Sequence, residues 1–387
     1  MTRAVEPKQS SKISDTLQTR SVAEYRPKRG LSVPSITVLD REGRIVESEQ
    51  RQVFRYNVQQ GYGANIIFGI GTNGEWNRIT NAQRQQLMQI ETDEVARIND
   101  ELAILGRPSV EAWVGVTAST RQETLANLDC AIELGADAAV IAPLSISDLG
   151  NLIEFFQRGI TDLLDRRGSQ MPVFLYDNAD IAIDPRVPHL RTKDVKQLSR
   201  LPFVRGLKVS APRRVLGNYT KAAANFKDSG EFGIYIGDAM LIFDVYKLKS
   251  GLLGKLHEYW NRYLLHNELP IGVVSGPGNP LPREWQRAWR ACYTGDDEMA
   301  AEYESIFNAF TAAYSFQHNG APVSKLIACL KYALKLDDVI KHDDVASGTV
   351  TLTDDDRILF RDRYARVKDQ IASTNPLWIS RSSDSGL

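Results

Sequence analysis

Cysteine and histidine are scarce in this chain of 387 residues. The three cysteines, Cys130, Cys292 and Cys329, are far apart and form no CxxC pair, which argues against a disulfide framework and favours buried thiols in a reducing compartment. The five histidines are scattered, and no HExxH motif occurs, so the sequence predicts no metal site. A serine hydrolase is not indicated either, because the GxSxG motif is missing.

The chain also lacks an excess of charge and a long hydrophobic run. Lys and Arg number 47 against 48 Asp and Glu, so no global field attracts nucleic acid or an anionic membrane. The longest apolar stretch, Ala136 to Leu144, is far shorter than the roughly 20 residues of a membrane span. The first thirty residues are polar and lack the apolar core of a secretion signal. We therefore expect a cytoplasmic protein with no membrane or nucleic-acid partner.

What the chain does contain is a repeated alternation of short apolar runs and longer segments with helical periodicity. This pattern is typical of βα units, and eight such runs suit a closed (β/α)8 TIM barrel better than an open sheet. Hydrophobic residues at 43% allow the large core that such a barrel needs. The predicted strands lie near Ser32–Val38, Asn65–Ile70, Val110–Val116, Ala138–Ala142, Pro172–Tyr176, Phe203–Val209, Gly233–Ile236 and Ile271–Ser275.

The flanking segments extend this barrel. We expect a polar N-terminal arm at 1–30, the barrel at 31–282, helices packed on it at 283–371, and a flexible tail at 372–387. The strand signals end beyond Pro282, so the region up to Ile371 is predicted to be helical throughout, with breaks at Gly320 and at Thr349–Asp354. The stretch Leu252 to Leu269 is aromatic and charged, which favours an amphipathic helix at the surface or at a subunit contact. A substrate lid is the alternative.

Two residues at neighbouring strand ends could carry chemistry together. In the sixth run, alternation places Gly206 and Lys208 on one face, and burial in an apolar strand would lower the pKa of the Lys208 amine toward a nucleophilic state. Tyr176 ends the fifth run and could move protons once an imine forms. Alone, each is more ordinarily a solvent-reaching lysine or a half-buried strand tyrosine. Only the pairing of the two favours a catalytic role.

The segment Gly69–Glu75 follows the second run and matches GxGxxG, which raises the question of a dinucleotide site. The match is weak, because the acidic residues about 20 positions further on, Glu91 and Asp93, fall in a predicted helix rather than at a strand end. Glu75 and Trp76 would also crowd a pyrophosphate. The better interpretation is a compact turn whose backbone N–H groups and Thr72 hydroxyl bind a small carboxylate.

In order and spacing, five segments resemble those of the dihydrodipicolinate synthase and N-acetylneuraminate lyase family, the class I pyruvate aldolases. Gly71 to Glu75 looks like the family's GTTGE loop, Tyr176 like its catalytic tyrosine in LeuTyrAspAsn, and Lys208 like its Schiff-base lysine. Gly237-Asp238 and Gly272 to Asn279 look like its GD and GxxSxxxN stretches.

The resemblance implies a barrel with C-terminal helices, a lysine imine with a pyruvate-like 2-oxo acid, no cofactor, and a homotetramer or dimer. By the same resemblance, Gly71, Thr72 and Asn73 would hold the substrate carboxylate. The carbonyl of Val274 would face the lysine, and Asp238 would touch the polar end of a longer substrate, such as one formed with an aldehyde.

The sequence also departs from the family pattern. Asn73 replaces the second loop threonine, and Ile181 stands where the lysine-biosynthesis branch carries an arginine, which argues against dihydrodipicolinate synthase itself. Leu144 and Ser145 stand where that branch has a relay tyrosine lent by the neighbouring subunit. Asp177 replaces the usual asparagine, on the strand face turned away from the imine.

These observations predict a lyase, either an aldolase or a dehydratase, that acts on a pyruvate-type 2-oxo acid. A barrel that binds 2-oxo acids or sugar acids without catalysis is the second interpretation. A nicotinamide-dependent oxidoreductase is a third, and it depends on the glycine motif alone.

Overall fold

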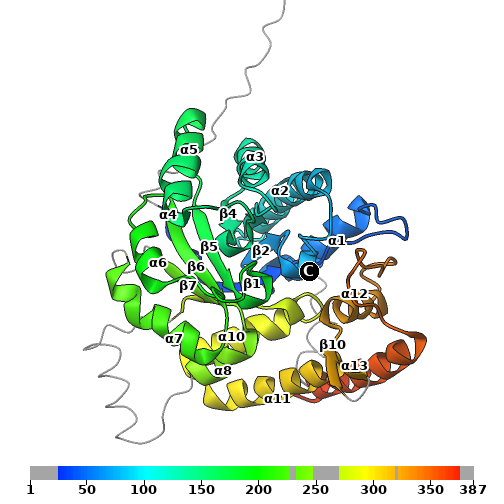
Figure 1. Cartoon of the computed structure of the whole chain (residues 1–387). Helices are drawn as coiled ribbons and strands as arrows, with labels where there is room; N and C mark the ends of the chain where they lie inside the picture. Colours follow the sequence, from blue (N-terminus) through cyan, green and yellow to red (C-terminus); the bar gives the residue numbers. More distant parts are fainter. Residues whose placement is uncertain (1–24, 227–231, 247–269, 319–320, 375–387) are drawn as a thin grey trace, which may run out of the picture.

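A closed barrel of eight parallel strands forms the centre of the molecule in the computed structural model (Figure 1), which describes residues 25–226, 232–246, 270–318 and 321–374. The strands pair in chain order, and β1 pairs with β8 to close the barrel. All eight strands predicted from the sequence are present. They are β1 (Gly30–Pro34), β2 (Ile66–Gly69), β3 (Glu111–Gly115), β4 (Ala138–Ile141), β5 (Val173–Asn178), β6 (Val204–Ser210), β7 (Gly233–Ile236) and β8 (Gly272–Val274).

Aromatic side chains fill the barrel interior near the amino ends of the strands. Trp113 and Phe174 stack with ring centroids 3.9 Å apart, and Tyr235 packs edge-on against both. Tyr25, which precedes the first strand, adds a buried ring below them and donates a hydrogen bond of 2.9 Å to the Glu111 carboxylate. This end of the barrel is therefore packed with side chains, as barrel interiors usually are.

The helices that follow the strands form an outer layer (Figure 1). The predicted capping box is present, since Thr80 and Gln83 bond each other's backbone at the start of α2. Gly135, with a φ of 70°, follows the end of α3 as expected. The helices of this layer are α1 (Glu47–Val58), α2 (Asn81–Ile104), α3 (Arg121–Glu133), α4 (Leu152–Glu154), α5 (Thr161–Arg167), α6 (Thr192–Leu198), α7 (Arg213–Ala222) and α8 (Ile242–Val245).

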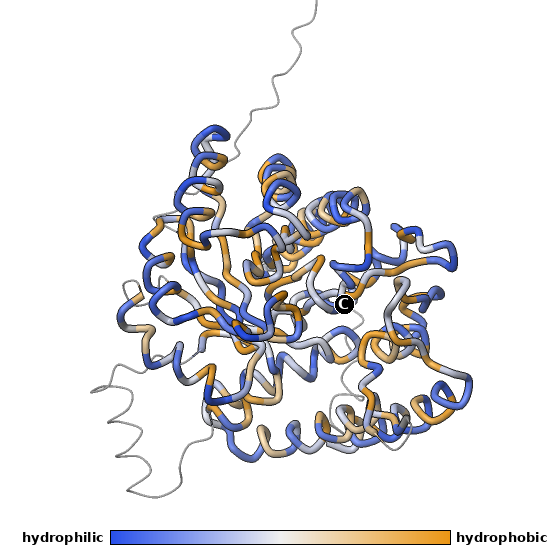
Figure 2. Tube along the Cα trace, viewed as in Figure 1, coloured by the Kyte–Doolittle hydropathy of each residue, from blue (hydrophilic) through white to orange (hydrophobic). Residues whose placement is uncertain are grey.

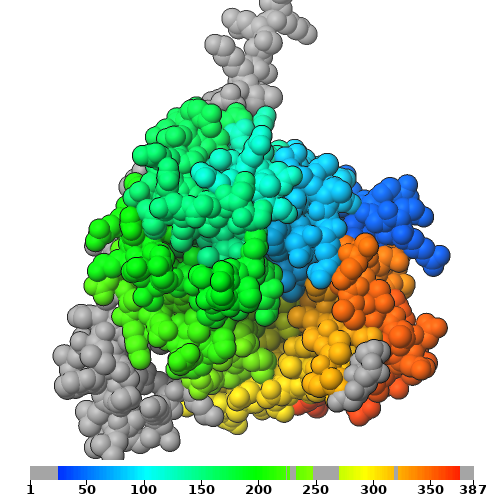
Figure 3. Space-filling view, in the orientation of Figure 1, coloured from blue at the N-terminus to red at the C-terminus, as the bar shows by residue number. Residues whose placement is uncertain are grey.

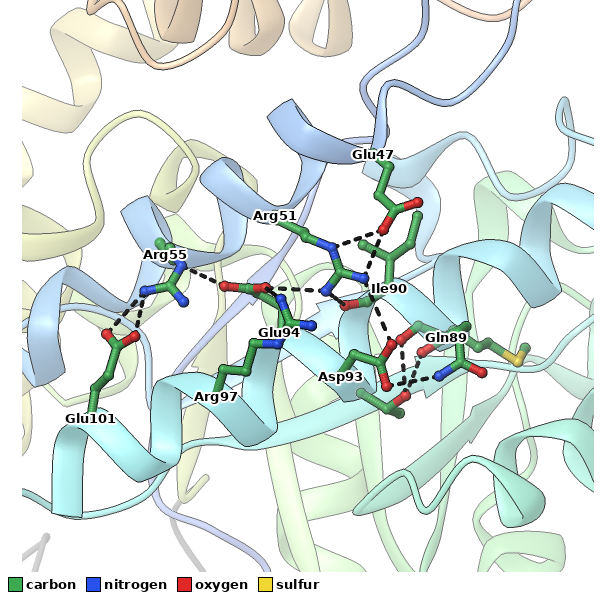
Figure 4. Close-up of polar contacts among 11 residues, drawn as sticks. Glu47, Arg51, Arg55, Gln89, Ile90, Asp93, Glu94, Arg97 and Glu101 are labelled. Atoms are coloured by element: carbon green, nitrogen blue, oxygen red, sulfur yellow. Dashed lines mark hydrogen bonds and ion pairs between the residues drawn. The ribbon is translucent and has the colours of Figure 1, made fainter.

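A group of ion pairs joins α1 to α2 on the outside of the barrel (Figure 4). The Glu94 side chain is 2% exposed and accepts contacts from Arg51, at 3.1 Å, and from Arg55. Arg51 also bonds Glu47, and Arg55 bonds Glu101, so the two arginines link several acidic groups. Such a network positions two long helices against each other, although its exposed members add little stability.

The C-terminal region packs against the barrel and forms one continuous surface with it (Figure 3). It contains α10 (Pro282–Thr294), α11 (Asp297–Ala313), α12 (Leu326–Leu336) and α13 (Asp354–Thr374). The expectation that this region is helical throughout is wrong, because β9 (Ser315–His318) and β10 (Ala321–Ser324) pair as an antiparallel hairpin. Helix α13 also includes 372–374, which were expected in the tail. Leu252 to Leu269 and Gly320 lie outside the described residues.

Hydrophobic residues follow the barrel strands and the inner sides of the helices, and hydrophilic residues follow the loops and outer sides (Figure 2). Cys292 and Cys329 are buried free thiols, and Cys130 is half-buried. Over the described residues, no helix combines the length and the apolar character that a membrane crossing requires.

Candidate active site

Lys208 and Tyr176 are direct neighbours across the β5–β6 pair. Their Cα atoms are register partners, and the Lys208 Nζ lies 3.7 Å from the centroid of the Tyr176 ring. Both side chains are 5% exposed. Below Lys208, Gly206 leaves space for the Phe174 ring, because a Cβ at this glycine would lie 2.6 Å from a ring carbon. The absence of a side chain at Gly206 thus lets the aromatic layer pack directly beneath the amine.

The Tyr176 hydroxyl is the centre of a small hydrogen-bonded cluster. It lies 3.1 Å from the Thr72 hydroxyl, which reaches it from the turn after β2. The Asn178 side-chain amide donates to it at 3.0 Å, and the Ser210 hydroxyl donates at 3.4 Å. Asn178 and Ser210 are themselves register partners, two residues beyond Tyr176 and Lys208. Three side chains of two adjacent strands and one turn residue therefore form a single polar group.

Burial and mutual interaction shift the ionisation of both residues. Burial lowers the pKa of the Lys208 amine below its ordinary value, against a smaller opposing effect of Tyr176. Burial would by itself raise the pKa of the Tyr176 phenol, but the adjacent Lys208 charge and the hydrogen bonds of Ser210, Thr72 and Lys208 outweigh it and lower that pKa. The lowered pKa of the amine favours its neutral form, the form that attacks a ketone, whereas the lowered pKa of the phenol depends on the positive charge of Lys208 and applies while that charge is present.

These residues line a cavity of about 390 Å³ at the carboxyl ends of the strands. Thr72 and Asn73 form its wall on the side of β2, in a short 3₁₀ turn over Thr72–Gly74. The amide of Asn73 packs against Gly276, where a Cβ would lie 2.3 Å from its nitrogen. The turn and the loop after β8 are therefore in close contact, which limits the positions open to the Asn73 amide.

Six of the seven predicted site residues line this cavity: Lys208, Tyr176, Thr72, Asn73, Asp238 and Val274. Gly71 is not among the lining residues. Its carbonyl oxygen accepts hydrogen bonds from the backbone N–H groups of Gly74, at 3.0 Å, and Trp76. Gly71 therefore stabilises the turn through its backbone. The prediction that Gly71 contacts the ligand has no support in this geometry.

Several lining residues escaped the sequence analysis. Asn178 and Ser210 could have been found from strand alternation, because each lies two positions after a predicted catalytic residue. His189, Thr311 and Tyr314 could not, because a loop and the C-terminal helices bring them to the cavity.

The described residues that line the cavity include more acidic than basic side chains. Among the described lining residues Lys208 is the one lysine or arginine, whereas Asp180 and Asp238 are both acidic and exposed. The cavity walls remove part of the water around Asp238 and raise the pKa of its carboxyl, against a backbone hydrogen bond from Met240. Ile181, which stands where an arginine was considered, is half-buried against apolar residues.

The glycine motif does not form a dinucleotide site in this structure. It leads into a three-residue turn, and the long helix α2 begins only at Asn81, so no helix N-terminus faces the motif. Glu75 is fully buried and bonds Lys331, while Glu91 is buried in α2 and accepts from the backbone of Gly69 at 3.1 Å. Neither acid is free to bind a ribose.

Neither a protein-family model nor a curated protein matches the sequence. Solved structures do match. Dihydrodipicolinate synthase from Bacteroides thetaiotaomicron has a TM-score of 0.68 and 20% identity, covering 88% of this chain and 99% of that chain. The synthase from Aquifex aeolicus has a TM-score of 0.66 and 16% identity, covering 88% and 98%. YagE from E. coli K12, a dihydrodipicolinic acid synthase family protein in complex with pyruvate, has a TM-score of 0.65 and 18% identity, covering 88% and 98%. The chain thus has the (β/α)8-barrel fold of these dihydrodipicolinate synthase structures, as its sequence motifs predict.

Proposed function

We propose that this chain is a lyase of the dihydrodipicolinate synthase and N-acetylneuraminate lyase family, acting on a pyruvate-type 2-oxo acid through a Schiff base on Lys208. The observation that carries the proposal is the buried Lys208 amine, held against the Tyr176 ring at 3.7 Å with a lowered pKa in an open cavity. Two groups of this kind suit amine attack on a ketone and the proton transfers that follow.

The cavity accounts for each part of a small keto acid. The carboxylate would bind at the Thr72–Asn73 turn, through the Thr72 hydroxyl and the Asn73 amide. The ketone carbon would then face Lys208, and loss of its oxygen as water would give the iminium. The pyruvate complex of YagE, a protein of the same fold, supports this choice of ligand.

The second reactant is proposed to carry no further negative charge. A carboxylate beyond the keto acid would meet Asp180 and Asp238, and no arginine lines the described part of the cavity to offset them. An uncharged aldehyde fits these walls better. Carbon–carbon cleavage, condensation, and loss of water from a 2-keto-3-deoxy acid all use the same iminium. The homo-oligomer implied by the resemblance and the cytoplasmic location expected from the sequence belong to this proposal as well.

Reduction with borohydride in the presence of pyruvate tests the proposal. The wild type should gain the mass of a reduced pyruvate adduct, and K208M should not. Lys335 offers a control, because it pairs with Asp343, is 44% exposed and does not line the cavity. K335M should therefore keep the adduct.

A barrel that binds without catalysis would give a different result. The positions of the family's relay tyrosine are filled here by Leu144 and Ser145, and the Ser145 hydroxyl donates to the Ile181 carbonyl at 2.8 Å. An adduct at Lys208 without turnover of pyruvate with any aldehyde of a broad panel would favour the binding protein over the lyase.

A further inference from the structure

A carboxylate–imidazole pair lies beside the cavity and has no part in the chemistry described above. The Nδ1 atom of His189 lies 3.0 Å from Oδ2 of Asp177. Asp177 is fully buried, on the β5 face turned away from Tyr176, whereas the His189 side chain is 23% exposed and lines the cavity. A buried acid thus holds one ring nitrogen of a histidine that faces the substrate space.

Asp177 is fixed by further bonds. Its Oδ1 atom accepts the backbone N–H of Leu190 at 2.8 Å, and the Tyr219 hydroxyl lies 3.0 Å from Oδ2. A carboxylate held in this way keeps the proton of a neutral His189 on Nδ1 and leaves Nε2 as an acceptor. Among the described residues, none hydrogen-bonds Nε2, and the His189 side chain lines the cavity.

The proposed chemistry needs such a group. Apart from Lys208, whose nitrogen is part of the imine once the substrate is bound, the partners of the Tyr176 hydroxyl are two alcohols, Thr72 and Ser210, and the amide of Asn178. None of these three ionises near neutral pH. An imidazole is the side chain that takes up and releases protons between about pH 5 and 8. Among the described residues that line the cavity, His189 is the one histidine.

We propose that His189 is the proton-relay residue of this cavity, and that Asp177 is its positioning residue. The inference rests on the proposed Schiff base. When the C3–H bond of the pyruvate iminium breaks, its electron pair forms the C2=C3 double bond and the iminium nitrogen becomes neutral. The proton passes to the Tyr176 oxygen, then through cavity water to Nε2 of His189, and from there to solvent. The reverse path returns a solvent proton to C3.

Exchange of the pyruvate methyl protons in D2O, followed by proton NMR, tests this relay without a second substrate. We expect H189N to slow the exchange by about tenfold or more, because asparagine can still donate to Asp177 but cannot carry a proton. Borohydride should still give the adduct at Lys208 in H189N, since imine formation uses other groups. Added imidazole should restore part of the exchange, which a purely structural defect would not allow.

His342 provides the matched control. Its Nδ1 atom lies 2.8 Å from Glu49, so it forms a similar pair, but it does not line the cavity. H342N should exchange pyruvate protons like the wild type, and D177N should lie between the wild type and H189N. Equal exchange in H189N and the wild type, or a wild type that forms the adduct without any exchange, would overturn the relay. A wild type without an adduct would instead overturn the proposed function.

Discussion

Lys331 of α12 and Glu75 of the turn after β2 form a fully buried ion pair, with Nζ and Oε2 2.5 Å apart. The same Glu75 carboxylate accepts the backbone N–H of Ala346 at 2.8 Å and the Thr349 hydroxyl at 2.6 Å. Glu75 directly follows the Thr72–Gly74 turn and has a φ of 57°. The C-terminal region therefore anchors the turn that lines the cavity.

Removing the cation of this pair should be costly. K331M leaves the buried Glu75 carboxylate without its ammonium partner, and we expect a loss of about 3–5 kcal/mol in the free energy of unfolding, measured with urea. The control is K335M on the same helix. The Lys335 side chain is 44% exposed and pairs with Asp343, so its loss should lower the free energy of unfolding by less than about 1 kcal/mol. Equal effects of the two changes would contradict a structural role for the buried pair.

The buried amine of Lys208 should destabilise the fold at neutral pH. Its pKa is lowered from 10.5 in the folded state, so the unfolded chain binds the proton more tightly and the stability of the wild type rises with pH in this range. We expect K208M to be more stable than the wild type at pH 7, with a difference that shrinks as the pH approaches and passes 10.5. Urea unfolding at pH 7 and pH 10.5 measures this. A difference that grows with pH would show that the amine is not held below its ordinary pKa.

Removal of the Tyr176 hydroxyl should impair proton transfer more than folding. We expect Y176F to lower turnover by about 10²–10⁴-fold, the usual contribution of an acid–base group, while the protein still folds. Y235F is the control, since the Tyr235 hydroxyl donates to the Lys28 carbonyl at 2.6 Å and does not line the cavity. Turnover of pyruvate with an aldehyde substrate measures the effect on proton transfer, and circular dichroism measures the effect on folding. Wild-type turnover in Y176F would remove this tyrosine from the mechanism.

Gly276 should matter for ligand binding through Asn73. The added methyl group of G276A would lie 2.3 Å from the Asn73 amide nitrogen and displace it, so we expect pyruvate to bind about tenfold more weakly with little loss of stability. At Gly217, in α7, a Cβ meets nothing within 4 Å, and G217A should leave binding unchanged. Pyruvate affinity is measured by calorimetry. If both variants bind like the wild type, Asn73 does not hold the ligand.

The barrel could be predicted from the sequence because its strands are short, mostly apolar runs separated by segments with helical periodicity. The β9–β10 hairpin could not, because its second strand, Ala321–Ser324, is largely exposed and shows no alternation of apolar residues. Lys208 and Tyr176 could be predicted as a pair because both end adjacent strands.

The rest of the site depends on tertiary structure. His189 reaches the cavity through the loop before α6, a path that local sequence patterns do not determine. Tyr314 comes from the end of α11, more than a hundred residues beyond Lys208. The pairing of Glu75 with Lys331 is similarly remote in sequence.

A crystal structure of the full chain soaked with pyruvate tests the central claim most directly. We predict continuous density from the Lys208 Nζ to C2 of the ligand, with the ligand carboxylate on the Thr72–Asn73 turn and the Tyr176 hydroxyl beside the new bond. Pyruvate bound elsewhere, or an unmodified Lys208 in a cavity saturated with pyruvate, would contradict the account.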